Sequence, residues 1–202
     1  MIIPAMKKTY NGQVVLDFEG LEIEGGKIYA LMGDNGSGKS TLAKILSGII
    51  PSDKGKYKAD INIGYLSQAP YVFNLTVKNN ILQNSDGMSK EEANKRCEFL
   101  MNQLGISDIA NKKAIKVSGG EKAKMALCRI LMKKYDLLIL DEPTSSMDGD
   151  SVLSSFELIK KVAFETGATV IVIIHGEEYA KMIASKAIIL NHSGTLKEFS
   201  DL

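Results

Sequence analysis

The feature that most constrains the fold of this chain is the glycine-rich segment Gly33–Ser40, whose sequence is GDNGSGKS. It fits the pattern G-x-x-x-x-G-K-S, in which glycines let the backbone curl until several N–H groups face one concavity. Apolar residues 28–32 before it predict a buried strand, and residues 42–46 after it predict a helix. This order predicts a phosphate-binding loop, with the partial positive charge of the helix N-terminus directed at the phosphate.

Two side chains of this loop have predicted roles. We expect Lys39 to reach the β- and γ-phosphates of a nucleotide, and the Ser40 hydroxyl to bind Mg²⁺. The alternative is a glycine-rich turn that binds nothing, but the complete spacing and both flanking elements argue against it. The other predicted nucleotide-binding positions near the loop are Val15, Asn35, Gly36, Ser37, Gly38 and Thr41.

Composition limits the remaining classes. The chain has 202 residues, of which 45% are apolar and 24% charged, as expected for one globular domain with a real core. A net charge of +1 gives no reason to expect a nucleic-acid partner. Apolar stretches fall short of the about 20 residues that span a bilayer, and no signal pattern opens the chain. Cys97 and Cys128 are expected to be reduced core residues. These features predict a cytoplasmic protein that reaches a membrane only through a partner.

Turn and periodicity signals predict an α/β chain in one domain, residues 1–202. Residues 1–71 and 117–202 are expected to form the core, a mainly parallel sheet flanked by helices, with antiparallel strands at the N-terminus. Residues 72–116 lack strand signals and predict a small helical insertion. The capping box Ser89-x-x-Glu92 opens a helix in it. The apolar face of that helix comprises Ala93, Cys97, Leu100, Met101 and Leu104.

Polar residues follow the strands of the second half. Asp141 and Glu142 end the apolar run that begins at Leu137, and His175 ends the next apolar run. A lone histidine is usually structural, but ligands bind at the carboxyl edge of open α/β sheets, so all three are candidate site residues. A helix is predicted between these runs, and a hairpin closes the chain around His192, which is interpreted as a turn residue.

Three further positions do not identify a function when each is considered by itself. The segment Ser118-Gly119-Gly120 opens a helix with stripe residues Ala123, Ala126, Leu127, Ile130 and Leu131. It is either an anion site or a simple N-cap, and by itself the N-cap reading is favoured. Tyr10 either stacks on adenine or is a half-exposed strand residue. Gln68, at a strand end, is by itself an ordinary polar surface residue.

Taken in order, these pieces resemble the ATP-binding-cassette (ABC) ATPases along essentially the whole chain. Gly33–Ser40 matches Walker A, Gln68 the Q-loop and Ser118–Glu121 the signature motif. The resemblance continues with Leu137–Asp141 as Walker B, Glu142 at the catalytic glutamate, Ser145–Asp148 as the D-loop, His175 as the switch histidine and Tyr10 at the A-loop position. Departures from the commonest pattern are Val117, Glu121 and Gly176-Glu177.

The resemblance implies a P-loop NTPase fold of the RecA-like type and a set of roles. Lys39 and the loop amides would hold the phosphates of ATP. Ser40, Gln68 and Asp141 would hold Mg²⁺, the last directly or through water. Glu142 would polarise the attacking water, and His175 would hold the γ-phosphate. Tyr10 would stack on adenine, and Ser118, Gly119 and Gly120 would complete the site of a second subunit in a head-to-tail dimer.

The resemblance further implies a subunit that powers a membrane transporter through permease subunits, at the inner face of the membrane. The alternative is a soluble cassette protein acting on ribosomes or DNA. A P-loop kinase would leave Ser118–Gly120 and His175 unexplained. Residues 70–77 look somewhat like importers of tungstate-type oxyanions, with small exporters as the other reading. Residues 71–73 either pack internally or line a docking groove for a permease helix.

Overall fold

The computed structural model describes residues 1–202, and its contacts divide the chain into two compact units. The first unit comprises Met1–Tyr65, Tyr135–Glu142 and Ala163–Leu202. The second comprises Leu66–Lys134 and Pro143–Val162. Each unit is described by itself below.

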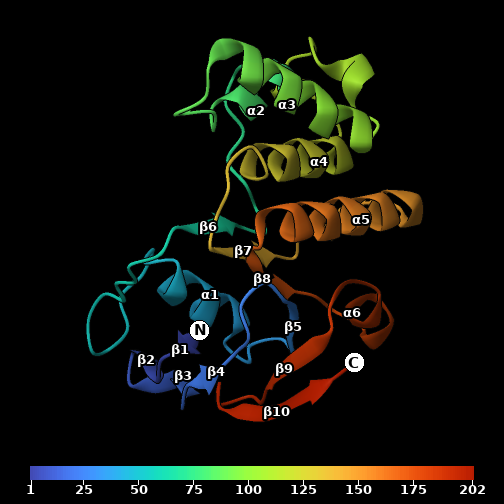
Figure 1. The fold of residues 1–202 in the computed structure, drawn as a ribbon. Helices are drawn as coiled ribbons and strands as arrows, with labels where there is room; N and C mark the ends of the chain where they lie inside the picture. Colours follow the sequence, from blue (N-terminus) through green and yellow to red (C-terminus); the bar gives the residue numbers. More distant parts are fainter. The chain divides into compact units, whose positions relative to one another are not determined.

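The strands form three sheets, and the main one is mostly parallel (Figure 1). Its strand order is β10-β9-β5-β8-β7-β6, with β5 parallel to both β8 and β9, and β7 parallel to β8. β10 lies antiparallel to β9 at one edge. The predicted mainly parallel α/β fold is therefore confirmed. The strands are β1 (Ile2–Ile3), β2 (Met6–Tyr10), β3 (Gln13–Phe18), β4 (Leu21–Glu22), β5 (Ile28–Gly33), β6 (Ile63–Leu66), β7 (Leu137–Asp141), β8 (Thr169–Ile173), β9 (Lys186–Leu190) and β10 (Leu196–Asp201).

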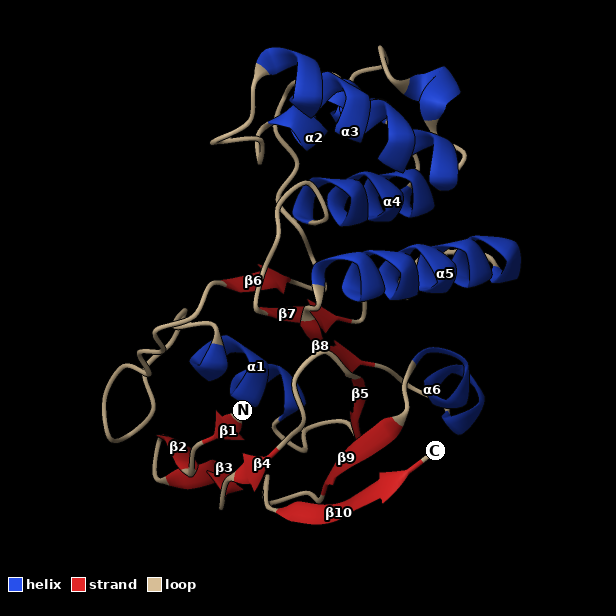
Figure 2. Cartoon of the chain, in the orientation of Figure 1, coloured by secondary structure: helices blue, strands red, loops and turns tan.

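From β5 to β9, at least one helix separates each strand from the next along the chain (Figure 2). No helix combines the length and the hydropathy required to span a bilayer. The helices are α1 (Lys39–Leu46), α2 (Val77–Leu82), α3 (Lys90–Gln103), α4 (Gly119–Ile130), α5 (Gly149–Thr166) and α6 (Glu177–Ile183), with 3-10 turns η1 (Ser107–Ile109) and η2 (Ala114–Lys116).

The antiparallel N-terminal strands are present as predicted. β2 and β3 form a hairpin in which Tyr10 is paired with Gln13. Asn11 and Gly12 between them have φ values of 49° and 81°, the left-handed conformation that a tight two-residue hairpin turn requires. A second antiparallel pair joins β1 to β4.

The core of the first unit lies between the main sheet, α1 and the N-terminal strands. Every residue of β7 and β8 is buried, which explains their unbroken apolar sequences, because a central parallel strand is covered on both faces. α1 contacts β5 and β7 and buries Leu42, Ala43, Ile45 and Leu46. Each large apolar side chain buried in this way stabilises the fold by roughly 1.5–3 kcal/mol.

The second unit is built on α2, α3 and α4, which pack against one another. The predicted capping box at Ser89 and Glu92 is present at the start of α3, and Gly105, with φ 62°, follows the end of this helix. The two cysteines are buried and free, as expected. Burial raises the pKa of the Cys97 thiol to about 11, so it stays protonated at neutral pH.

Three details differ from the sequence interpretation. Two short helices, α2 and α6, were not predicted, because six or seven residues give too little periodicity to identify. The predicted stripe of α4 was partly wrong: Ala123 and Ile130 are only half-buried, whereas Met125 and Cys128 are fully buried. The reason is that α4 packs against both α2 and α3, and therefore buries a different and wider face.

Candidate active site

The lysine of the loop between β5 and α1 is hydrogen-bonded to the backbone of that loop. Lys39 donates hydrogen bonds from Nζ to the carbonyl oxygens of Gly33 and Asp34, both at 2.8 Å. Its side chain is nearly inaccessible, and burial lowers the pKa of the ammonium, an effect opposed by Glu142, Asp34 and Asp141. A buried cation whose hydrogen bonds go to neutral carbonyls is a favourable partner for an incoming anion.

Close backbone approach explains two of the glycines. Gly38 has φ 88°, and a Cβ atom there would lie 2.6 Å from the carbonyl oxygen of Val15. Gly33 has φ 138°, and a Cβ atom there would lie 2.4 Å from the carbonyl oxygen of Leu190. Only glycine fits both the conformation and the space, so the loop is fixed between β3 and β9.

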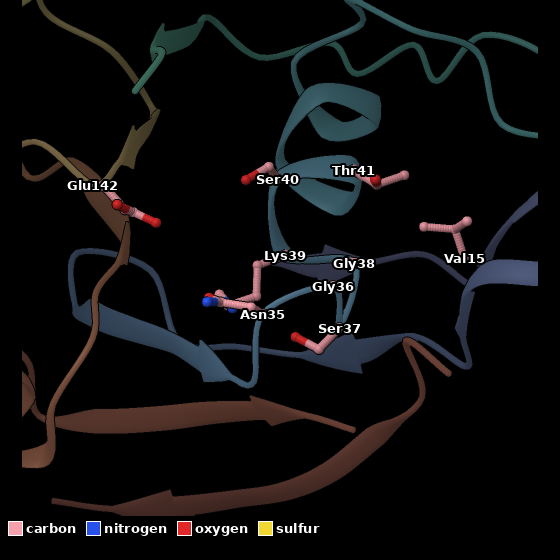
Figure 3. Close-up of a pocket in the computed structure, with 9 residues that line it drawn as sticks. All are labelled: Val15, Asn35, Gly36, Ser37, Gly38, Lys39, Ser40, Thr41 and Glu142. Carbon is pink, nitrogen blue, oxygen red and sulfur yellow. The ribbon is translucent and has the colours of Figure 1, made fainter. Parts of the chain in front are cut away.

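A pocket of about 190 Å³ opens at this loop, lined by Val15, the segment 35–41 and Glu142 (Figure 3). In the close-up, the Ser40 hydroxyl and the Glu142 carboxylate point toward each other across it, while Thr41 points away. Pockets for drug-sized ligands start at about 300 Å³, so this one suits the phosphates of a nucleotide rather than its base. The Ser37 hydroxyl is buried here without a hydrogen-bond partner, as expected of a loop shaped for a further acceptor.

Beside the pocket, Asp141 accepts two hydrogen bonds. Ser40 Oγ donates to Oδ1 at 3.2 Å, and the Tyr65 hydroxyl donates to Oδ2 at 2.9 Å. The aspartate is 2% exposed. Burial and the charge of Asp141 raise the pKa of Tyr65, so its hydroxyl remains a donor. Tyr65 was not identified from the sequence, because an aromatic residue in an alternating strand is normally a packing residue.

The donor set at this point suits a hard cation. No group of three or more histidine, cysteine, aspartate or glutamate side chains is placed to hold a metal ion. The available ligands are instead the Ser40 hydroxyl and the Asp141 carboxylate, which are both oxygens. Oxygen ligands supplied by one or two side chains, and completed by phosphate and water, are the usual environment of Mg²⁺. The residues therefore fit this ion.

Glu142 and His175 meet at the carboxyl edge of the sheet. Nε2 of His175 lies 2.8 Å from Oε1 of Glu142. The two strands preceding them pair in parallel, with Asp141 opposite Ile173, so the register brings the residues together. Glu142 has φ 50°, a left-handed conformation that is uncommon for a non-glycine residue and is often found at functional sites. The carboxylate and the imidazole are therefore placed to form a hydrogen bond.

Two further residues of the first unit, Tyr10 and His192, were singled out in the sequence. Tyr10 is 45% exposed at the end of β2, and the Lys8 ammonium lies 5.1 Å from the centre of its ring. His192 is a turn residue, as interpreted, but Nε2 also lies 3.2 Å from Oδ2 of Asp34 in the phosphate loop. The sequence held no signal for this contact, because it joins segments distant along the chain.

The other predicted site residues belong to the second unit. Ser118 is the N-cap of α4: its hydroxyl accepts from Glu121 N, and its own N–H donates to the Glu121 carboxylate. These bonds lower the pKa of Glu121. A Cβ atom on Gly120 would lie 3.0 Å from the carbonyl oxygen of Ser146. Gln68 follows β6 in the same unit. Roles for Gln68, Ser118, Gly119 and Gly120 at the nucleotide stay predictions.

A strand–loop–helix phosphate site on a mainly parallel α/β sheet defines the class of P-loop NTPases. A family model described as ABC transporter matches residues 18–145, and the chain belongs to this family. It is thus an ATP-binding and ATP-hydrolysing subunit of the ABC transporter type.

Individual relatives agree. The chain is 35% identical to the tungstate uptake system ATP-binding protein TupC of Peptoclostridium acidaminophilum, over 96% of this chain and 94% of that protein. It is 32% identical to the energy-coupling factor transporter ATP-binding protein EcfA1 of Thermotoga maritima, over 84% and 70%. Its structure is similar to the dimeric structure of MJ0796, a bacterial ABC transporter cassette, with a TM-score of 0.87, 26% identity and coverage of 100% and 99%.

Proposed function

We propose that this protein hydrolyses ATP to power uptake of a tungstate-type oxyanion through a membrane permease, at the inner face of the membrane. The observation that carries the substrate class is the 35% identity to a protein named for tungstate uptake, over nearly the full length of both chains. The resemblance of residues 70–77 to importers of tungstate-type oxyanions supports the same substrate class. Similar proteins are named for import of phosphonates and methionine. We therefore assign selection of the substrate to the permease, which the transported molecule would contact.

Hydrolysis is assigned to the residues around the pocket. Lys39 would exchange its two carbonyl partners for β- and γ-phosphate oxygens, which bring full negative charge in place of neutral acceptors. Glu142 would hold the attacking water and accept its proton. His175, whose Nε2 lies 2.8 Å from Oε1 of Glu142, would orient that carboxylate and hold the γ-phosphate. Phosphoryl transfer needs this positioning and charge stabilisation more than covalent chemistry.

Mg²⁺ is assigned to Ser40 and Asp141, with Gln68 as a third ligand. The two first residues already lie 3.2 Å apart, oxygen to oxygen. When bound, the ion would neutralise charge that develops on the β- and γ-phosphates. The protein's own part is to hold the serine and aspartate oxygens in place before the ion arrives.

A second copy of the chain is proposed to complete the nucleotide site. The first turn of a helix has backbone N–H groups without intrahelical partners, and α4 begins at Gly119 and Gly120 directly after Ser118. Such N–H groups suit the γ-phosphate bound by another chain. The similar dimeric structure of MJ0796 supports a dimer. Its head-to-tail arrangement, which would bring Ser118 to the nucleotide of the partner, is part of the proposal.

An aromatic pair in the second unit is proposed as the permease contact. Tyr71 is 71% exposed and packs edge-to-face on Phe73, with ring centres 4.9 Å apart. Arg129 donates from Nη2 to the Tyr71 carbonyl oxygen at 2.7 Å and lies 5.4 Å from the Phe73 ring. Arg129 thus contacts both residues, while the Tyr71 side chain remains mostly exposed. This exposure favours the docking reading of residues 71–73 over internal packing.

The test is reconstitution. The protein is combined with its permease in proteoliposomes, and ATP-dependent accumulation of radiolabelled tungstate is measured against sulfate. We expect tungstate uptake with wild-type protein and none with Glu142→Gln. Uptake of neither anion would reject the oxyanion assignment. Cosedimentation with ribosomes in preference to permease-containing membranes would favour the soluble alternative.

A further inference from the structure

The main sheet places a tyrosine hydroxyl directly against the buried aspartate of the site. Tyr65 lies in β6, which neighbours β7 in the sheet (Figure 1). Its hydroxyl donates to Oδ2 of Asp141 at 2.9 Å, while Ser40 Oγ donates to Oδ1. Both oxygens of this carboxylate therefore accept a hydrogen bond: one from Tyr65 in β6, and the other from Ser40 in α1.

The position of Tyr65 is set by contacts just before β6 and within it. Asn62 N donates to the Asp136 carboxylate at 2.7 Å, and Asp136 N donates back to the Asn62 carbonyl at 2.9 Å. Two residues on, a Cβ atom at Gly64 would lie 2.9 Å from the ring of Tyr135. The strand therefore lies close against residues 135–136. Since side chains alternate along a strand, Tyr65 faces away from Gly64, toward the carboxylate.

We infer that Tyr65 is a positioning residue for the metal: its hydroxyl holds Oδ2 of Asp141 so that Oδ1 stays directed at Ser40 and the ion. A buried carboxylate needs hydrogen bonds, and the one supplied by Tyr65 also blocks rotation of the group. Hydrogen bonds behind a metal ligand commonly change metal affinity or activity 10- to 100-fold when removed. The inference rests on the proposed role of Asp141 in Mg²⁺ binding.

The hydrogen bond also joins two places where the chain passes between its units. The first unit ends at Tyr65 and again at Glu142, directly after Asp141. Tyr65 lies three residues before Gln68 in the sequence, and Asp141 lies directly before Glu142. A phenylalanine at position 65 would keep the ring in the same strand but would lack this hydrogen bond.

The experiment compares four full-length variants with wild type: Tyr65→Phe, Tyr57→Phe, Asp141→Asn and the double variant Tyr65→Phe/Asp141→Asn. Phenylalanine keeps the ring, so the packing of the half-buried side chain is retained. Tyr57 is a matched control, because it is another partly buried tyrosine packed against the same core. Binding of Mn²⁺ to protein saturated with the non-hydrolysable analogue AMP-PNP is followed by EPR, and AMP-PNP binding is also measured in EDTA.

We expect Tyr65→Phe to weaken Mn²⁺ binding about 10-fold or more, with AMP-PNP affinity in EDTA unchanged and Tyr57→Phe like wild type. In the Asp141→Asn background, adding Tyr65→Phe should cause no further loss, because it acts through that carboxylate. Normal Mn²⁺ binding by Tyr65→Phe, with Asp141→Asn impaired, overturns the inference alone. A full additional loss in the double variant overturns it as well. Normal binding by Asp141→Asn overturns the proposed metal role of Asp141 together with it.

Discussion

His175 is in direct contact with Glu142, because the imidazole Nε2 lies 2.8 Å from the carboxylate Oε1 across two paired strands. The Glu142 backbone has φ 50°, a left-handed conformation that is rare for glutamate. A carboxylate fixed in this way, on the wall of a phosphate-sized pocket, is suited to orient a water molecule.

Glu142→Gln should therefore abolish steady-state ATP hydrolysis while preserving ATP binding. The amide keeps the shape of the side chain but cannot take up a proton. A loss of about 10²–10⁴-fold in kcat is expected, which is the usual contribution of a general base. Phosphate release and equilibrium ATP binding measure the two properties. Turnover within a few-fold of wild type would show that Glu142 is not the critical base.

Lys39→Ala should weaken ATP binding, because it removes the cation expected at the β- and γ-phosphates. Charge-assisted hydrogen bonds contribute roughly 1.5–3 kcal/mol each, so we expect about a 10- to 100-fold loss. Calorimetric titration with ATP measures it. Lys44→Ala, later in the same helix α1, is the control and should bind ATP normally. An unchanged ATP affinity in Lys39→Ala would contradict the assignment.

The dimer proposal is tested in the Glu142→Gln background, where ATP should persist. This protein should dimerise with ATP and stay largely monomeric with ADP, as measured by light scattering. Adding Ser118→Arg should block the dimer by placing a bulky side chain at the interface, while monomer ATP binding remains nearly intact.

The chain offers a matched control for that variant. Ser89 is the N-cap of α3 and has the same reciprocal bonds to a glutamate three residues on. Ser89→Arg should damage a cap to the same degree without preventing the ATP-dependent dimer. If Ser118→Arg protein still dimerises as well as its parent, Ser118 does not face the nucleotide of the partner.

A comparison of two glycines tests the close packing around the phosphate loop. A Cβ atom on Gly194 would lie 2.6 Å from Cα of Leu16, whereas one on Gly12 would meet nothing within 4 Å, although both residues have positive φ. Gly12→Ala should cost about 1–2 kcal/mol for its conformation. Gly194→Ala should cost about 1–3 kcal/mol more from overpacking. Urea denaturation measures both, and equal losses would contradict this packing.

The charge on Glu121 should make stability depend on pH. Its pKa is lowered from 4.5 in the folded chain by bonds from Ser118, so it stabilises the fold fully above pH 4.5. That contribution is lost as the pH falls through the lowered pKa. Glu121→Gln should therefore be less stable than wild type at pH 7, by about 0.3–1 kcal/mol, the usual value for a charge at a helix N-terminus.

The measurement is the Tm of both proteins from pH 7 down to pH 3. The difference between them should shrink as the pH falls. Glu198→Gln, an exposed glutamate in β10, corrects for the change in net charge and should not reproduce this pattern. A difference that stays constant with pH would contradict a role for the charge.

The sequence by itself determined the features that depend on local chemistry. The phosphate loop, the Asn11-Gly12 hairpin, the capping box at Ser89 and the N-cap at Ser118 each lie within a few residues of chain, and the structure has all of them. Unbroken apolar runs predicted the central strands β7 and β8, because a strand that is buried on both faces consists almost entirely of apolar residues.

Only the tertiary structure decided which side chains meet. The hydrogen bond from Tyr65 to Asp141 joins residues 76 positions apart, and the contact of His175 with Glu142 joins residues 33 apart. The pairing of β7 with β8 and the closeness of Gly194 to Leu16 likewise depend on sheet order and register. The spacing of motifs along the sequence does not predict these distances. Which strands become neighbours depends on the packing of the whole sheet, not on the sequence of any one strand.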